Sequence, residues 1–201
     1  MDDRSSFSAI HSSKSGCGKC FPKAICGFSS GCAGARSSFR ICRYGLSCCR
    51  ATQGRPTLAV GQPGHILYSD DAGRAWKQAD VPVSSDLVAV SFADARNAWA
   101  VGHDGVVLHS ADAGQTWRVQ YDGRGAKQGA QDPWLDVWFA PDAREGYVVG
   151  AFGQAMHTTD AGANWTPVQQ DLDNPKGLHL YAVRQIGSDL YIAGEQGLLL
   201  K

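Results

Sequence analysis

Residues 110–117 are Ser110-Ala111-Asp112-Ala113-Gly114-Gln115-Thr116-Trp117, and this stretch decides the fold because its pattern occurs three times in the chain. The shared pattern is Ser/Thr-x-Asp-x-Gly-x-x-Trp. Its copies are Ser69, Asp71, Gly73 and Trp76 upstream, Ser110, Asp112, Gly114 and Trp117 in the centre, and Thr158, Asp160, Gly162 and Trp165 downstream. The aspartates at 71, 112 and 160 are 41 and then 48 residues apart, which is close to the period of propeller blades. One supersecondary unit is therefore used three times.

The residue types of this octad favour a hairpin connection. It lies between two short strand-like runs, 106–109 and 117–120. Asp and Ser side chains hydrogen-bond their own backbone in turns, and Gly tolerates a positive φ. The closing Trp has a large apolar surface to bury and an indole N–H that needs a partner. We therefore expect a turn between two antiparallel strands in each copy.

A second repeated element, Gly-x-x-Gly followed by a short apolar run, occurs four times. Its glycines are Gly61/Gly64, Gly102/Gly105, Gly150/Gly153 and Gly194/Gly197. Together the two elements predict an all-β protein, an incomplete β-propeller of four-stranded antiparallel blades at about 57–80, 87–120, 135–169 and 180–201. The pattern gives about three and a half blades, because the first lacks its innermost strand and the fourth ends after its third strand. A fragment of a longer propeller, or self-association through open propeller edges, would account for this.

Residues 1–52 differ from the rest of the chain in composition. All seven cysteines lie here, and Cys17 and Cys20 form a Cys-x-x-Cys without a second pair at zinc-site spacing. A metal site and a disulfide module remain alternatives to a disordered or non-native segment, which the lack of periodicity favours. An export signal would need an apolar core of 7–15 residues, and none is visible. We expect the propeller to occupy residues 53–201.

Charge excludes some classes of function. Residues 1–50 hold eight Lys/Arg and two Asp/Glu, whereas residues 51–201 hold eleven and seventeen. The repeat region is mildly acidic, which argues against a nucleic-acid partner. No run of 18 or more apolar residues occurs, so the sequence predicts no membrane-spanning segment. We expect no cofactor and no metal in the repeats.

The second residue of each Gly-x-x-Gly turn differs from blade to blade: Gln62, His103, Ala151 and Glu195. We expect these side chains to line one rim of the propeller. A long connection that carries Arg124 and Lys127 follows the second blade. The predicted partner-binding rim is therefore Gln62, His103, Arg124, Lys127 and Glu195.

The octad resembles the Asp-box, or bacterial neuraminidase repeat, which marks a hairpin of propeller blades in several unrelated families. That resemblance implies a folding role for Asp71, Asp112 and Asp160, with a calcium or catalytic role as the alternative. A sialidase would need an arginine triad and a Tyr/Glu pair, but the repeats hold only Glu145 and Glu195 as glutamates. We therefore expect no catalytic residues and no enzyme activity.

The order of elements within a blade is more specific than the octad alone: an apolar first run, then the Gly-x-x-Gly turn, then the octad. Residues 87–92 are followed by Trp99-Ala100-Val101-Gly102, and residues 135–139 by Gly146-Tyr147-Val148-Val149-Gly150. Over residues 57–201 this order resembles the photosystem II stability and assembly factor family. The resemblance implies a non-enzymatic propeller scaffold that binds another protein to assist assembly of a photosynthetic or envelope complex, exported to the thylakoid lumen, periplasm or cell envelope. The alternative is an Asp-box sialidase-like or glycan-binding propeller with a deep central pocket.

Overall fold

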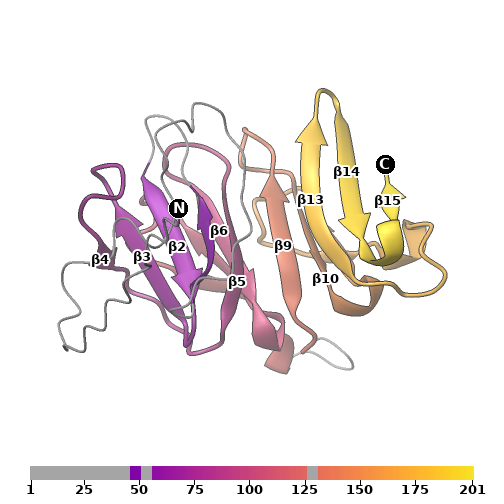
Figure 1. Cartoon of the computed structure of the whole chain (residues 1–201), viewed down its shortest axis with the longest axis horizontal. Coiled ribbons are helices and arrows are strands. Elements are labelled where there is room, and N and C mark those ends of the chain that lie inside the picture. The colour runs from indigo at the N-terminus through magenta and orange to yellow at the C-terminus, as the bar shows by residue number, and fades with distance from the viewer. Residues whose placement is uncertain (1–45, 51–55, 126–130) are drawn as a thin grey trace, which may run out of the picture.

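A computed structural model describes residues 46–50, 56–125 and 131–201, and these form four antiparallel sheets in a row (Figure 1). Sheet 1 contains β1 (Leu46–Arg50), β2 (Thr57–Gly61), β3 (His65–Ser69) and β4 (Lys77–Gln78). Sheet 2 contains β5 (Leu87–Phe92), β6 (Ala98–Gly102), β7 (Val107–Ser110) and β8 (Arg118–Tyr121). Sheet 3 contains β9 (Trp134–Phe139), β10 (Gly146–Gly150), β11 (Ala155–Thr158) and β12 (Thr166–Pro167). Sheet 4 contains β13 (Leu180–Ile186), β14 (Asp189–Gly194) and β15 (Leu199–Leu200).

The first strands of the sheets lie next to one another, as they do around the axis of a propeller. Strand β5 contacts both β1 and β9, and β9 also contacts β13. Each sheet has its strands in sequence order from the inside outward, which is the arrangement of a propeller blade. The expected all-β, four-stranded antiparallel blades are therefore confirmed. Sheets 1 and 4 lie at opposite ends of the row (Figure 1).

Sheet 1 differs from the sequence-based expectation, because its innermost position is filled. Strand β1 pairs with β2 from Leu46↔Gly61 to Arg50↔Leu58. The expected start of the propeller at residue 53 is therefore too late by one strand. This strand, Leu-Ser-Cys-Cys-Arg, has no clear hydrophobic alternation, so the pattern that marks the other inner strands is absent here. The other residues of the 1–52 segment, including Cys17 and Cys20, lie outside the described residues.

Hydrophobic residues fill the spaces between neighbouring sheets. The cluster between sheets 1 and 2 includes Leu58, Ile66 and Leu108, all fully buried. Between sheets 2 and 3, the buried Trp99 stacks on Phe139 with ring centroids 3.6 Å apart. The apolar surface that each sheet buries against the next sheet holds the row together.

Two ends of the molecule follow from this strand order. The Asp-boxes connect the third and fourth strands, so they gather at one end with the turns between the first and second strands; we call this the box end. The Gly-x-x-Gly turns connect the second and third strands, so they gather with the connections between sheets at the other end, the turn end, at the bottom of Figure 1. Short 3-10 helices occupy this end, namely η1 (His103–Gly105), η2 (Gly123–Gly125), η3 (Ala151–Gly153), η4 (Gln169–Asp171) and η5 (Glu195–Gly197). None of the helices in the described ranges has the length and apolar composition needed to cross a bilayer.

Candidate functional site

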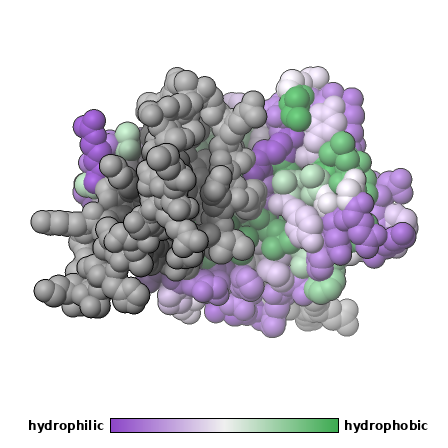
Figure 2. Space-filling view, viewed as in Figure 1, coloured by the Kyte–Doolittle hydropathy of each residue, from purple (hydrophilic) through white to green (hydrophobic). Residues whose placement is uncertain are grey.

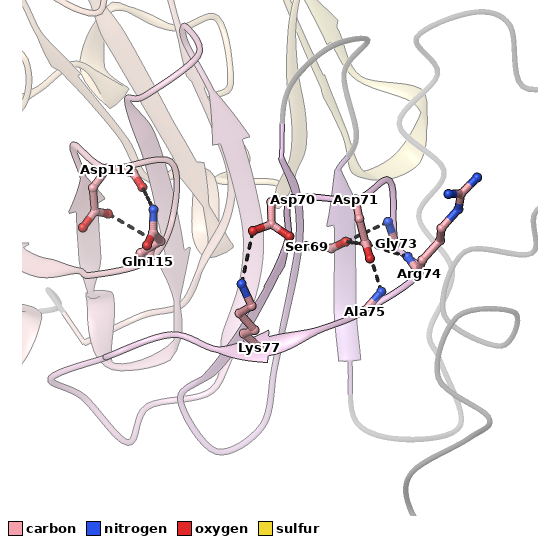
Figure 3. A network of polar contacts seen from close by, with 9 residues as sticks. All are labelled: Ser69, Asp70, Asp71, Gly73, Arg74, Ala75, Lys77, Asp112 and Gln115. Atoms are coloured by element: carbon pink, nitrogen blue, oxygen red, sulfur yellow. Dashed lines mark hydrogen bonds and ion pairs between the residues drawn. The ribbon is translucent and has the colours of Figure 1, made fainter.

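The polar side chains of the first Asp-box are engaged within the box itself (Figure 3). The Ser69 hydroxyl donates to Asp71 Oδ1 at 2.7 Å and accepts the N–H of Gly73 at 2.8 Å. Asp71 Oδ1 also accepts the backbone N–H groups of Arg74 and Ala75 at 2.8 and 2.9 Å. One carboxylate oxygen therefore organises three donors of the hairpin, which is the chemistry that favours Asp in tight turns.

The second and third boxes repeat this network. Asp112 Oδ1 accepts the N–H groups of Gln115 and Thr116 at 3.1 and 2.9 Å. Asp160 accepts both the backbone N–H and the side-chain amide of Asn164, at 2.9 and 2.7 Å. In all three boxes the Ala after the Asp and the Gly after that Ala have positive φ, so two successive residues are left-handed, as in a type I′ hairpin turn.

The box tryptophans are less uniform. The indole N–H groups of Trp76 and Trp117 donate to the carbonyls of Gly73 and Gly114, at 3.1 and 3.0 Å. Trp165 packs edge-on against Phe139, and its indole N–H is buried without a partner among the described residues. The packing role of the tryptophan is thus kept in the third box while its hydrogen bond is not.

Hydrogen bonding within the boxes lowers the pKa of each box aspartate. For Asp71 the main cause is the N–H of Ala75, followed by the Ser69 hydroxyl. The side-chain amide of Asn164 is the main cause that lowers the pKa of Asp160 to about 2. Burial raises the pKa of Asp112, but hydrogen bonds from Thr116 and Ser110 outweigh it, so the pKa is lowered overall. These carboxylates stay ionised at neutral pH and are unsuited to act as general acids.

A small cavity of about 260 Å³ lies beside the second box. Its lining residues are Arg96, His109, Ala111, Asp112, Thr116 and Arg118. The His109 ring stacks on Trp99 with centroids 4.4 Å apart, and burial followed by the charge of Arg118 lowers the pKa of His109. This cavity belongs to the box end of one blade, whereas a glycan-cleaving propeller would need a central pocket. Among the residues that the structure describes, no three His, Cys, Asp or Glu side chains gather as they would around a metal ion.

The predicted partner-binding rim lies at the turn end. Gln62, His103 and Arg124 are exposed, and Glu195 is half-buried. Ala151, which was expected at the same rim, is buried instead. Helices η1 and η2 are in contact, so the structure brings the connection that carries Arg124 next to the turn that carries His103. Arg124 Nη2 pairs with Asp122 Oδ2 at 2.7 Å. Lys127 lies outside the described residues.

Several of the glycines that bound these turns lie close to backbone atoms of other segments. A Cβ at Gly102 would lie 2.0 Å from the carbonyl oxygen of Asp86, and a Cβ at Gly64 would lie 2.1 Å from that of Val83. Each turn therefore presses directly against a connection that leads into an inner strand. The glycines hold the shape of the turn end, and the two residues between them are left to vary.

The third residue of the Gly-x-x-Gly turn was not singled out by the sequence analysis. It has a positive φ in sheets 2, 3 and 4, at Asp104, Phe152 and Gln196. A phenylalanine with φ of 54° is unusual, and the side chain of Phe152 is 63% exposed. A large aromatic group is thus presented to solvent from a strained backbone position.

Two further aromatic side chains accompany Phe152. The ring of His179 lies 4.9 Å from that of Phe152 and 6.2 Å from that of Tyr181. The N–H of Phe152 donates to His179 Nδ1 at 3.0 Å, and the N–H of Glu195 donates to the carbonyl of His179 at 2.8 Å. We call Phe152, His179 and Tyr181 the aromatic cluster. Within the described residues, Glu195 is the only member of the predicted rim with a hydrogen bond to this cluster. The repeated Gly-x-x-Gly turn was the sequence signal that could have pointed to Phe152.

A buried ion pair links sheets 3 and 4 and was also missed from sequence. Asp136 on β9 is 1% exposed, and its Oδ2 pairs with Arg184 Nη1 on β13. The same oxygen accepts the N–H of Val183 at 2.9 Å. Burial raises the pKa of Asp136, although Arg184 opposes this. The pair links the inner strand of sheet 4 to that of sheet 3.

Comparison with known families gives a match over almost all of the described chain. The model of the family described as photosynthesis system II assembly factor YCF48 matches residues 47–124 and 125–201. No curated protein matches this chain.

Solved structures similar to this chain include two of YCF48. One is YCF48 bound to a D1 peptide, with a TM-score of 0.55 and 17% identity over 71% of this chain and 45% of that one. The other is YCF48 from Cyanidioschyzon merolae, with a TM-score of 0.59 and 18% identity over 77% of this chain and 49% of that one. This chain therefore spans about half the length of these relatives. At this identity the likeness concerns the fold alone.

Proposed function

The chain belongs to the photosystem II assembly factor YCF48 family, and on this premise we propose that it is a non-enzymatic propeller scaffold that binds a segment of another protein at its turn end. The observation that carries the proposal is the contrast within each blade. At the box end the Ser/Thr and Asp side chains bond within the hairpin, whereas at the turn end the exposed Gln62 and His103 project from turns that recurring glycines bound. Rigid turns with variable side chains are a common basis for recognition.

A peptide is a suitable class of partner for this site. The solved relative bound to a D1 peptide shows that a propeller of this family can hold one. The turn end offers Gln62, His103 and Glu195 as hydrogen-bonding groups and the aromatic cluster as apolar surface. Binding of this kind would assist assembly or stability of a photosynthetic or envelope complex, on the exported side of a membrane.

The test is a binding measurement with the full chain. Fluorescence anisotropy with a labelled D1 peptide is expected to show saturable binding, weakened in the double variant His103→Ala/Glu195→Ala. Arg74→Ala is the matched control at the box end, since the backbone N–H that bonds Asp71 is kept in this variant. Absence of binding, or equal loss in the control, would contradict the proposal. Assays with sialosides and other glycosides are expected to show no turnover.

Sheet 4 offers a second kind of contact, and we propose that it packs against a second copy of the chain. Leu199 is 66% exposed, although Val107 at the matching position of sheet 2 is fully buried. Ala193 is likewise exposed where Val101 and Val149 are fully buried against the next sheet. Figure 2 shows hydrophobic residues at the surface of this part of the molecule. A second copy that packs against sheet 4 would cover these exposed apolar side chains.

The mass in solution tests self-association. Light scattering of the full chain is expected to give a dimer, and Leu199→Asp is expected to give a monomer because it places a charge in the buried contact. A monomer of the unsubstituted chain at micromolar concentration would contradict this proposal.

A further inference from the structure

The aromatic cluster is not required by the fold of its turn. The matching position in sheet 2 is Asp104, which is held by the Ser85 hydroxyl at 2.6 Å, and in sheet 4 it is Gln196. Both show that a polar residue satisfies the left-handed position. A phenyl group at this φ costs conformational energy that Asn or Gly would largely avoid. Strain that the fold does not need is a reason to look for a binding role.

The cluster is held in place by three different segments of the chain. Phe152 comes from η3, His179 from the connection before sheet 4, and Tyr181 from β13. The hydrogen bond from the Phe152 N–H to the His179 ring joins the first two. The N–H of Glu195 bonds the His179 carbonyl and ties η5 to the same place. A pre-arranged and exposed aromatic surface loses little entropy on binding.

The segments that pack against the η3 turn carry several acidic residues. Asp132 accepts a hydrogen bond from Gln154, next to the η3 turn, at 2.7 Å. A Cβ at Gly153 would lie 2.7 Å from the amide nitrogen of Asn174, so the connection 171–179 lies against the same turn. The charged residues of these segments are Asp132, Asp171, Asp173, Lys176 and Glu195. Four carboxylates against one ammonium group give these neighbouring segments a negative balance.

We propose that the aromatic cluster binds an arginine or lysine side chain of an extended peptide. Exposed aromatic faces attract a guanidinium or ammonium group, and the negative balance of the neighbouring segments favours the approach of a basic ligand. The chemical class of the ligand is therefore a basic peptide segment. This inference rests on the proposed function, because it names the part of the partner that the turn end would recognise.

Titration of the full chain with a short peptide that carries arginine at alternate positions tests the inference. The matched probe is the same peptide with citrulline, which keeps the shape of arginine and removes its charge. NMR chemical shifts are expected to move at Phe152 and Tyr181 with the arginine peptide, and the citrulline peptide is expected to bind at least about tenfold more weakly. Equal binding of both peptides would overturn the inference.

Variants separate recognition from folding. Phe152→Asn is expected to weaken arginine-peptide binding about tenfold or more while the protein stays folded, because Asn tolerates the left-handed position. Val119→Ala, another exposed hydrophobic position, is the control and is expected to bind as the unsubstituted chain does. Unchanged binding by Phe152→Asn would overturn the inference.

The two proposals can fail separately. Binding of the arginine peptide without any D1-peptide binding would support the aromatic cluster as a basic-peptide site and contradict the broader proposed function. Binding of the D1 peptide that is insensitive to Phe152→Asn and to Tyr181→Ala would support the function and overturn the inference about its recognition site.

Discussion

The box end and the turn end are built from the same blades but use their side chains differently. At the box end, Ser69, Asp71 and Gly73 recur as equivalent residues in sheets 2 and 3, and their polar atoms bond within the hairpin. At the turn end only the glycines recur. Identical residues with satisfied hydrogen bonds indicate a structural role, whereas varied and exposed residues on a fixed turn indicate recognition. The comparison predicts that changes at the box end reduce stability and that changes at the turn end reduce binding.

The largest effect is expected at the glycine of the second box. Gly114 has a φ of 91°, and a Cβ there would lie 2.4 Å from Leu58 Cδ2 of the neighbouring sheet. Gly114→Ala should lower the free energy of unfolding by about 2–4 kcal/mol through backbone strain and overpacking. Gly73→Ala is the matched control, because its nearest contact would be Trp76 at 3.5 Å, and backbone strain alone should cost about 1–2 kcal/mol. Denaturant unfolding measures both changes. Equal losses of unfolding free energy in Gly114→Ala and Gly73→Ala would contradict a role for the second box in packing against the neighbouring sheet.

A smaller effect is expected from the carboxylate of the same box. Asp112→Ala removes the acceptor for the N–H groups of Gln115 and Thr116 and should cost about 1–3 kcal/mol. His103→Ala at the turn end should change stability by less than about 0.5 kcal/mol, since its side chain is exposed. Thermal unfolding of the two variants measures the difference directly. A similar loss for both would break the distinction between the two ends.

Acid should weaken the box end. The pKa of Asp160 is lowered to about 2, so its contribution to stability is present above the ordinary carboxyl value and is lost as pH falls through the lowered value. The free energy of unfolding should therefore fall between about pH 4 and pH 2, and it should fall less in Asp160→Asn than in the unsubstituted chain. Burial raises the pKa of Asp136, so this residue changes stability with pH in the opposite direction. Its contribution is the same in the variant and the parent, and it cancels when the two are compared. An unchanged decline in Asp160→Asn would contradict the expectation.

The only gain in stability is expected at Phe152. Phe152→Asn relieves the left-handed phenylalanine but loses its contact with the His179 ring, so stability should rise by no more than about 1 kcal/mol. Calorimetry of the variant measures this change. A clear loss of stability would show that Phe152 serves the fold, and the turn end would then resemble the box end.

Much of the fold could be predicted from the sequence because both repeated elements are local. The Ser110, Asp112 and Gly114 pattern lies within eight residues, and its hydrogen bonds close inside the same hairpin. Strand β1 was missed because Leu46–Arg50 lacks the alternation of hydrophobic residues that marks a strand. His103 and Glu195 of the predicted rim lie at the turn end, and the rim stays a prediction. The sequence patterns did not identify Phe152 and Tyr181, because the repeat does not show which aromatic side chains the packing leaves exposed.

By itself, the sequence determined the repeating blade, its two turns and its family. These depend on residues close together in the chain, where turn chemistry and strand alternation act directly. Only the tertiary structure decided which side chains meet across blades. Asp136 and Arg184 are 48 residues apart in sequence, and the members of the aromatic cluster come from separate segments. Contacts between blades depend on how the sheets pack against one another. Local turn and strand patterns shape each blade but do not determine which side chains of neighbouring blades meet.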